Sequence, residues 1–305
     1  MRVGKNSEKM NILKYSFVCM AALALCSCEN KAPDAELSVS VPRNTYKVGE
    51  PVTFSISGDA DNIVFYSGEP GHEYTLKDRL YADNDLMVDF VSYTDYTTEV
   101  HPNFQVLVSD DFNGIYTPAD VEAATWKDVT AEFTLPSKTG QNTPSGRVSL
   151  KKFLSDRNDA LFYLAFRYFD LDGVGVRNRW VVRSINIDKV TPEGGVATVA
   201  DIKTAGWRNV AVSGSVNWTL PGTQLLAAGN ATTSDKDVWA ITAGINLRAA
   251  EPATGVTLKN ISTRMDSYTH VYEKPGTYQA VFASSSVWHN SENFSTTSVT
   301  ITVTE

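Results

Sequence analysis

Cysteine is nearly absent from this sequence. The 305 residues contain three cysteines, and all of them lie within the first thirty positions, at Cys19, Cys26 and Cys28. The rest of the chain can therefore form no disulfide and no thiolate metal site.

Positive charge is also scarce. The whole chain has 27 basic and 35 acidic residues, a formal net charge of −8. Residues 1–27 hold four of the basic and one of the acidic residues, which leaves 23 basic and 34 acidic residues, a net −11, for the remainder. So acidic a surface repels nucleic-acid phosphates and anionic lipid head groups. Nucleic acid is not an expected partner.

Catalytic motifs are missing as well. His72-Glu73 begins like a His-Glu-x-x-His zinc motif, but Leu76 stands where the second histidine would be. The sequence contains no Gly-x-Ser-x-Gly elbow and no Walker loop. The four histidines are never two to four residues apart, at His72, His101, His270 and His289. We expect no catalytic residue, no metal and no cofactor.

Carboxylates are plentiful, and we interpret them as solvated loop residues. A glycosidase needs two of them facing each other about 5–10 Å apart across a sugar ring, and spacing in the sequence does not specify that. Asp170 and Asp172 with Gly173 faintly resemble a calcium loop. An EF-type loop has Glu at its twelfth position, where this sequence has Val181. A structural calcium ion stays an open alternative.

No apolar run at the N-terminus is long enough to span a bilayer. Residues 16–24 are mostly apolar and follow Lys14, but a helix needs ~20 residues to cross a ~30 Å hydrocarbon core. A basic residue before a short apolar run is typical of an export signal. Residues 1–27 are therefore predicted to be a signal peptide that starts at Met1 or Met10.

The signal ends in Leu25-Cys26-Ser27-Cys28, which resembles a bacterial lipobox. The resemblance implies that Cys28 becomes the lipidated N-terminus, because Cys26 would have Leu25 in place of a small preceding residue. Each buried methylene adds ~0.8 kcal/mol, so several acyl chains anchor a protein firmly. Residues 28–34 are predicted to be a polar tether, which resembles the acidic export tether of Bacteroidota surface lipoproteins. The alternative is an ordinary secretory signal with incidental cysteines.

Beyond residue 36, apolar residues alternate with a period of two. The stretch "PVTFSIS" places Val52, Phe54 and Ile56 on one side, and "SVTITVTE" repeats the pattern near the C-terminus. This period is typical of strands with one buried face. No segment carries an amphipathic helical stripe over three turns, and turn residues recur at short spacing. The chain is predicted to be all-β.

The two ends of the chain resemble two halves of one domain. "LSVSVPRNTYKVGEPVTFSIS" resembles the first strands of a PKD-type, immunoglobulin-like sandwich, and "YEKPGTYQAVF" resembles its last strands. Neither piece has enough strands to close a sandwich alone. We predict one PKD-like domain, residues 35–83 and 267–305, interrupted by an inserted β-sandwich, residues 84–266. The alternative is two consecutive sandwiches.

The stretch "SGRVSLKKFLSDRNDALFYLAFRYFDLDGVGVRNRWVVRSINI" within the insert is similar to jelly-roll units called choice-of-anchor or carbohydrate-binding-like. As a whole, the chain resembles a Bacteroidota family of surface lipoproteins of unknown function, found with polysaccharide-utilisation systems. The resemblance implies a non-catalytic lipoprotein of the outer membrane, facing the cell exterior. It would bind a glycan or assist outer-membrane transport proteins. The alternatives are a carbohydrate-active enzyme (a glycoside hydrolase or esterase) and a structural or adhesive surface lipoprotein.

Tryptophan side chains are candidates for sugar binding, because sugars stack their apolar faces on flat rings. The chain has six tryptophans. Trp180 and Trp239 lie in apolar strands and are expected in the core. Trp126 and Trp218 lie in mixed strands, so the sequence leaves both open.

Trp207 and Trp288 have polar, loop-like neighbours and are the predicted stacking platforms. His289 and Asn290 follow Trp288 directly, and they are predicted to offer hydrogen bonds to sugar hydroxyls. The alternative for Trp288 is that the preceding strand continues, in which case strand alternation would place its ring over the core.

Overall fold

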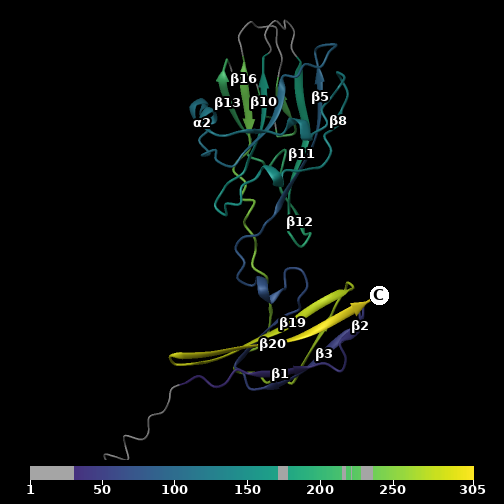
Figure 1. Ribbon diagram of the computed structural model, residues 1–305, viewed down its shortest axis with the longest axis vertical. Coiled ribbons are helices and arrows are strands. Elements are labelled where there is room, and N and C mark those ends of the chain that lie inside the picture. Colours follow the sequence, from purple (N-terminus) through teal and green to yellow (C-terminus); the bar gives the residue numbers. More distant parts are fainter. Residues whose placement is uncertain (1–30, 171–177, 215–217, 221, 228–235) are drawn as a thin grey trace, which may run out of the picture. The chain divides into compact units, whose positions relative to one another are not determined.

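The computed structural model describes residues 31–170, 178–214, 218–220, 222–227 and 236–305 (Figure 1). The predicted signal peptide, Cys28 and the Asp172-Gly173 part of the possible calcium loop lie outside these residues. Among the described residues, no helix is long and apolar enough to cross a membrane. Strands make up most of the regular structure, which confirms the predicted all-β class.

The chain divides into two compact units. One consists of Met1–Lys77 together with Ala253–Glu305, and the other of Asp78–Pro252. We call them the host unit and the inserted unit. Both consist of two β-sheets with a hydrophobic core between them.

The host unit is a sandwich to which both ends of the chain contribute. Its smaller sheet has the order β1 (Leu37–Ser40), β3 (Pro51–Gly58), β18 (Ser267–Val271). Its larger sheet has the order β17 (Val256–Lys259), β4 (Asn62–Tyr66), β19 (Gly276–Trp288), β20 (Ser291–Thr304), β2 (Thr45–Lys47). A short 3-10 helix, η1 (Tyr74–Leu76), precedes the inserted unit. Each sheet therefore joins N-terminal and C-terminal strands, through the pairs β3–β18 and β4–β19.

Three phenylalanines at the centre of the host core also come from both ends of the chain. The ring centroid of Phe282 lies 5.2 Å from that of Phe54 and 5.0 Å from that of Phe65. All three side chains are fully buried. Since Phe54 and Phe65 precede the insertion and Phe282 follows it, neither chain end can bury its apolar face alone.

The boundaries of the units differ from the predicted ones. Residues 253–266 were assigned to the insert, yet β17 pairs with β4, with Val256 opposite Phe65. This strand has only four residues, too few for its alternation to reveal which sheet it joins. At the first junction, residues 78–83 belong to the inserted unit, where the amide of Ala82 donates to the carbonyl of Arg248 at 2.9 Å.

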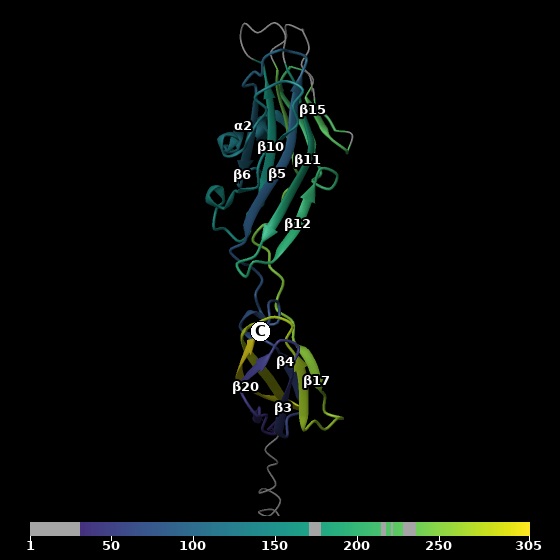
Figure 2. The ribbon, with the colours of Figure 1, turned by 90° about the vertical axis from the view of Figure 1, so that its right-hand side faces the viewer.

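The inserted unit also consists of two sheets (Figure 2). The five-stranded sheet has the order β13 (Arg208–Ser213), β16 (Asp237–Ile241), β10 (Tyr163–Phe169), β6 (Phe104–Ser109), β7 (Lys127–Asp128). The seven-stranded sheet has the order β14 (Trp218–Thr219), β15 (Leu225–Ala227), β11 (Arg179–Val190), β5 (Asp85–Asp95), β8 (Thr143–Pro144), with β12 (Val196–Asp201) on β11 and β9 (Val148–Ser149) on β5. In the described part of the inserted unit, three helical segments connect strands: α2 (Pro118–Ala123), η2 (Thr130–Glu132) and η3 (Lys151–Phe153).

Strand β10 has apolar residues on both faces because both faces are covered. Leu164 and Phe166 point into the main core between the sheets. Tyr163 and Ala165 face a second cluster with Val121 of α2. The strand lies in the middle of its sheet, as its continuous apolar sequence predicts.

Gly68, in the turn after β4, is a position that requires glycine. Its φ is +81°, and a Cβ there would lie 2.7 Å from the backbone nitrogen and oxygen of Gln279. Gly71 has a similar φ of +83°, with nothing within 4 Å of its Cβ position. An alanine in this conformation costs about 1–2 kcal/mol, and at Gly68 the clash with β19 adds to that cost.

We therefore expect Gly68→Ala to lower the free energy of unfolding of the host unit by about 3 kcal/mol or more. The matched Gly71→Ala variant should lower it by about 1–2 kcal/mol. Urea denaturation of both variants measures the difference. Equal losses would show that the approach of β19 to Gly68 does not constrain this turn.

Candidate functional site

Trp207, one of the two predicted stacking platforms, is a core residue. Its side chain is 9% exposed. The ring stacks on Phe166, with centroids 5.5 Å apart and planes 21° apart. The prediction for Trp207 was wrong because its polar neighbours only mark a short connection between β12 and β13, while the ring itself turns inward.

Trp288, His289 and Asn290 lie together at the tip of the β19–β20 hairpin. Trp288 is the last residue of β19 and pairs with Ser291. Its side chain is 55% exposed, so the ring does not cap the core, which was the alternative. Because Trp207 is buried in the other unit, the four predicted residues do not form one site.

The remaining tryptophans are structural. Trp180 and Trp239 are 2% and 7% exposed, which confirms their predicted place in the core. Trp218, left open by the sequence, is also buried. Trp126 is half-buried, with its ring centroid 5.1 Å from that of Trp239 and its indole N–H donating to the Val121 carbonyl.

Two histidines make contacts that tie chain segments together. The Nδ1 of His72 lies 2.7 Å from the carbonyl oxygen of Thr254. The Nε2 of His270 lies 2.8 Å from a carboxylate oxygen of Glu69, and its ring packs edge-on against Tyr272. In the part of the chain that the structure describes, no three His, Cys, Asp or Glu side chains gather as a metal-binding group.

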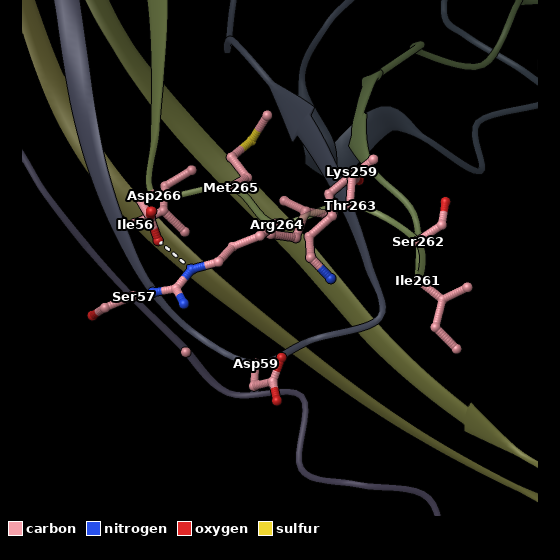
Figure 3. A pocket seen from close by; sticks show the side chains of 12 residues that line it. Ile56, Ser57, Asp59, Lys259, Ile261, Ser262, Thr263, Arg264, Met265 and Asp266 are labelled. Atoms are coloured by element: carbon pink, nitrogen blue, oxygen red, sulfur yellow. Dashed lines mark hydrogen bonds and ion pairs between the residues drawn. The ribbon is translucent and has the colours of Figure 1, made fainter.

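An open pocket of about 560 Å³ lies at one end of the host unit, between the end of β3 and the loop from β17 to β18 (Figure 3). Two cations of its lining, Arg264 and Lys259, are engaged with neighbours. Arg264 donates to Asp266 at 3.1 Å, and the Lys259 ammonium donates to the carbonyls of Ala60 and Asp61. No aromatic ring is among the described residues that line it, so it offers no platform for sugar stacking.

The outer face of the seven-stranded sheet carries aromatic and charged residues side by side. In β5, Phe90 points into the core, so strand alternation places Tyr93 and Asp95 on the outside. Tyr93 lies opposite Val181 of β11, and Val181 lies opposite Leu226 of β15. These three residues form an apolar row across three strands, in which Val181 is fully buried.

A bidentate ion pair borders this row. Arg179 donates from Nε to Asp95 at 3.0 Å and from its terminal nitrogen at 2.5 Å. The two residues are also directly opposite each other in the sheet. The hydrogen bonds that Arg179 donates to Asp95 raise the pKa of Arg179 above its ordinary value, so the guanidinium keeps its charge.

Tyr96 covers this ion pair from a strained backbone conformation. Its φ of 75° is the one positive φ found at a non-glycine residue among those the structure describes. The Arg179 guanidinium carbon lies 4.5 Å from the centroid of its ring, and the Nη1 of Arg179 donates to the Tyr96 hydroxyl at 2.8 Å. The side chain is nevertheless 58% exposed. Such a conformation costs about 1–3 kcal/mol and is concentrated at functional sites.

A buried asparagine holds the turn after Tyr96 in place. Asn178 is fully buried. Its side-chain oxygen accepts from the amide of His101 at 2.7 Å, and its nitrogen donates to the carbonyl of Glu99 at 2.9 Å and to the Thr97 hydroxyl. Tyr96 is therefore fixed on both sides, by this turn and by Arg179.

Arg183 completes the surface on the other side of the apolar row. It sits at a register shift of β11 against β5, between Val182 and Ser184. Its guanidinium carbon lies 4.8 Å from the Tyr93 ring centroid. We call the set Tyr93, Asp95, Tyr96, Arg179 and Arg183 the tyrosine–arginine face.

Sequence reasoning missed the tyrosine–arginine face. Its members come from two strands whose contacting residues lie 84 positions apart. Alternation in "DLMVDFVSYTD" does place Tyr93 and Asp95 on one side of a strand, opposite the side of Phe90. Nothing local in the sequence shows that β11 is the partner strand or in which register it pairs.

Comparisons with known proteins give a family and little beyond it. A family model with the description "Domain of unknown function (DUF5017)" matches residues 26–207. No curated protein matches the chain. A lectin from Bauhinia forficata in complex with GalNAc aligns with 10% identity over 72% of this chain and 94% of the lectin, with a TM-score of 0.12. That score is too low to relate the two folds.

Proposed function

Because the chain belongs to the DUF5017 family, whose description assigns no activity, we propose a function from the site itself: non-catalytic binding of a glycan by a lipid-anchored outer-membrane protein. The observation that carries the proposal is the tyrosine–arginine face. The sequence resemblance to Bacteroidota surface lipoproteins supports the location. It also suggests that the bound glycan is passed to outer-membrane transport proteins.

The tyrosine–arginine face has the two chemical properties that sugar recognition requires. The exposed ring of Tyr96 and the half-buried ring of Tyr93 can pack against the C–H faces of pyranose rings. Arg179, Asp95 and Arg183 offer donors and acceptors to hydroxyl groups at the edges of those rings. Since the two rings lie on the outer face of a sheet, the surface suits an extended glycan chain better than a single enclosed sugar.

The same face favours binding over hydrolysis. A glycosidase needs two carboxyl groups about 5–10 Å apart, on opposite sides of the scissile bond. The tyrosine–arginine face has one carboxylate, that of Asp95, and both of its oxygens accept from Arg179. A carboxylate held in this way orients an arginine and is poorly placed to transfer protons.

Replacing Tyr96 tests the proposal. Taking base–aromatic stacking as an analogy, loss of one platform ring costs about 1–3 kcal/mol of binding. We expect Tyr96→Ala to weaken binding of a recognised polysaccharide about 5-fold to 150-fold, and Tyr96→Phe to retain most of it. Affinity electrophoresis in gels that contain a panel of soluble polysaccharides measures the change.

Tyr81 provides the matched control. It is 47% exposed, belongs to the inserted unit and lies outside the tyrosine–arginine face. Tyr81→Ala should leave migration in the same gels unchanged. The proposal would be contradicted if Tyr81→Ala and Tyr96→Ala weakened polysaccharide binding equally. It would also be contradicted if Tyr96→Ala left that binding unchanged.

A further inference from the structure

One end of the host unit carries four exposed apolar side chains. Val287 and Trp288 are 50% and 55% exposed, Phe294 is 59% exposed and Ile261 is 73% exposed. Among the described residues of the host unit, no other large apolar side chain is as much as half exposed. We call these four residues the end patch.

The strand register shows that the end patch lies at a single end of the sandwich. Three of its members lie in the outermost part of the β19–β20 hairpin, where Trp288 pairs with Ser291. The fourth, Ile261, follows β17, whose last residue, Lys259, pairs with Ile63. Ile63 also pairs with Ser284 of β19. β17 therefore ends level with the part of β19 that leads into the hairpin tip, with β4 between the two strands.

The start of the described chain is hydrogen-bonded to this hairpin. The side-chain amide of Asn293 donates to the carbonyls of Ala32 and Pro33, at 2.7 and 2.8 Å. The Ala32 amide donates to the hydroxyl of Ser291, and the hydroxyl of Ser286 donates to the Asp34 carbonyl at 3.3 Å. Residues 32–34, predicted to be part of a free tether, therefore lie along the hairpin, and Figure 1 shows this segment beside its tip.

This contact limits how far the hairpin can be from the proposed lipid. Only residues 29–31 separate Cys28 from Ala32. Four steps of extended chain span at most about 14 Å. An acylated Cys28 lies at the bilayer surface, so Ala32, which contacts the hairpin, must lie within that reach of the lipid head groups.

The opposite end of the host unit holds the connections to the insert. Strand β4 begins at Asn62, near the end patch, and ends at Tyr66. Strand β17 begins at Val256, which pairs with Phe65 near that far end. The chain thus leaves for the insert, and returns from it, at the end away from the patch.

We propose that the end patch rests on the lipid surface that holds the N-terminal anchor. The inference builds on the proposed lipidation of Cys28. Tryptophan is enriched at membrane–water interfaces because its amphipathic ring suits the head-group level. The end carries charges of both signs, with Asp34, Asp61 and Glu292 beside the tip and Lys259 and Arg264 near Ile261. The net charge of −11 on the chain after residue 27 favours zwitterionic over anionic head groups. In this position Trp288, His289 and Asn290 face lipid, and this replaces their predicted role in glycan binding.

The test uses a tether that does not depend on acylation. A chain of residues 29–305 with an N-terminal hexahistidine tag is bound to phosphatidylcholine vesicles that contain a nickel-chelating lipid. Because this chain has no cysteine, Asn290→Cys introduces a single site for a fluorophore that is sensitive to polarity. Thr277→Cys is the matched control, since Thr277 is exposed at the other end of β19.

Tethering should shift the emission of the fluorophore at position 290 to shorter wavelengths, and spin-labelled lipid should quench it. The fluorophore at position 277 should show neither change. Adding Val287→Ser, Trp288→Ser and Phe294→Ser to the Asn290→Cys chain should abolish most of the shift. Anionic phosphatidylglycerol in the vesicles should reduce it.

Equal emission and quenching at positions 290 and 277 would overturn the proposal. A shift at position 290 caused by polysaccharide in the absence of vesicles would also overturn it, in favour of the predicted glycan site. If Cys28 were not acylated, labelling of the intact protein would reveal it, whereas the tethered chain would still report on the end patch. The two failures are therefore distinguishable.

Discussion

Ending the chain at Pro252 is expected to unfold residues 31–77 together with the part removed. The truncation deletes β17 to β20, so β3 loses its partner β18 and β4 loses its partner β19. It also removes Tyr278, Phe282 and Ile301 from the host core. Each large apolar side chain contributes about 1.5–3 kcal/mol, and domains are stable by only about 5–15 kcal/mol. Limited proteolysis should therefore cleave residues 31–77 rapidly in the truncated protein.

The inserted unit serves as the internal control in that experiment. Residues 78–252 have their own core, in which Phe104 stacks on Trp180 with centroids 4.5 Å apart. They should stay resistant to protease, both in the truncated protein and as an isolated fragment. A truncated protein in which residues 31–77 remain resistant would contradict the shared core of the two chain ends.

Cys28→Ala is expected to abolish attachment of lipid to the protein. The lipobox resemblance places the acyl chains on Cys28, and the only other cysteines, Cys19 and Cys26, lie within the predicted signal peptide. Metabolic labelling with a palmitate analogue should fall to background, and the protein should leave the outer-membrane fraction. The melting temperature of the folded part should not change, because Cys28 has no thiol partner in it.

Cys26→Ala is the matched control for the anchor. Leu25 precedes Cys26 where a lipobox has a small residue, so this variant should be labelled like the wild type. Label that persists in Cys28→Ala, or that is lost in Cys26→Ala, would place the anchor elsewhere.

The features predicted best from the sequence were those that depend on local period and on apolar content. Alternation identified β3 and β20, and a continuous apolar run identified β10 as a strand covered on both faces. These predictions succeed because the side chains of a strand alternate between its faces, whatever its partners are. The period says nothing about pairing, and the four residues of β17 were accordingly assigned to the wrong unit.

The surface residues were predicted less well because their environment comes from distant segments. Trp207 has polar neighbours in the sequence, yet its ring is covered by Phe166, on a strand of another part of the chain. Residues 32–34 look like a free tether, yet Asn293 and Ser286 bind their carbonyls. The tyrosine–arginine face depends on the register of β5 against β11, which no local pattern specifies.

The affinity of the isolated inserted unit for polysaccharides tests most directly whether the tyrosine–arginine face binds glycan. Polysaccharide in the gel should slow the migration of residues 78–252 as strongly as it slows that of residues 29–305. In both proteins Tyr96→Ala should weaken the interaction by the same factor, about 5-fold to 150-fold. Two results together would contradict the proposed function. The isolated unit would bind none of the polysaccharides that residues 29–305 bind, and Trp288→Ala in residues 29–305 would abolish that binding.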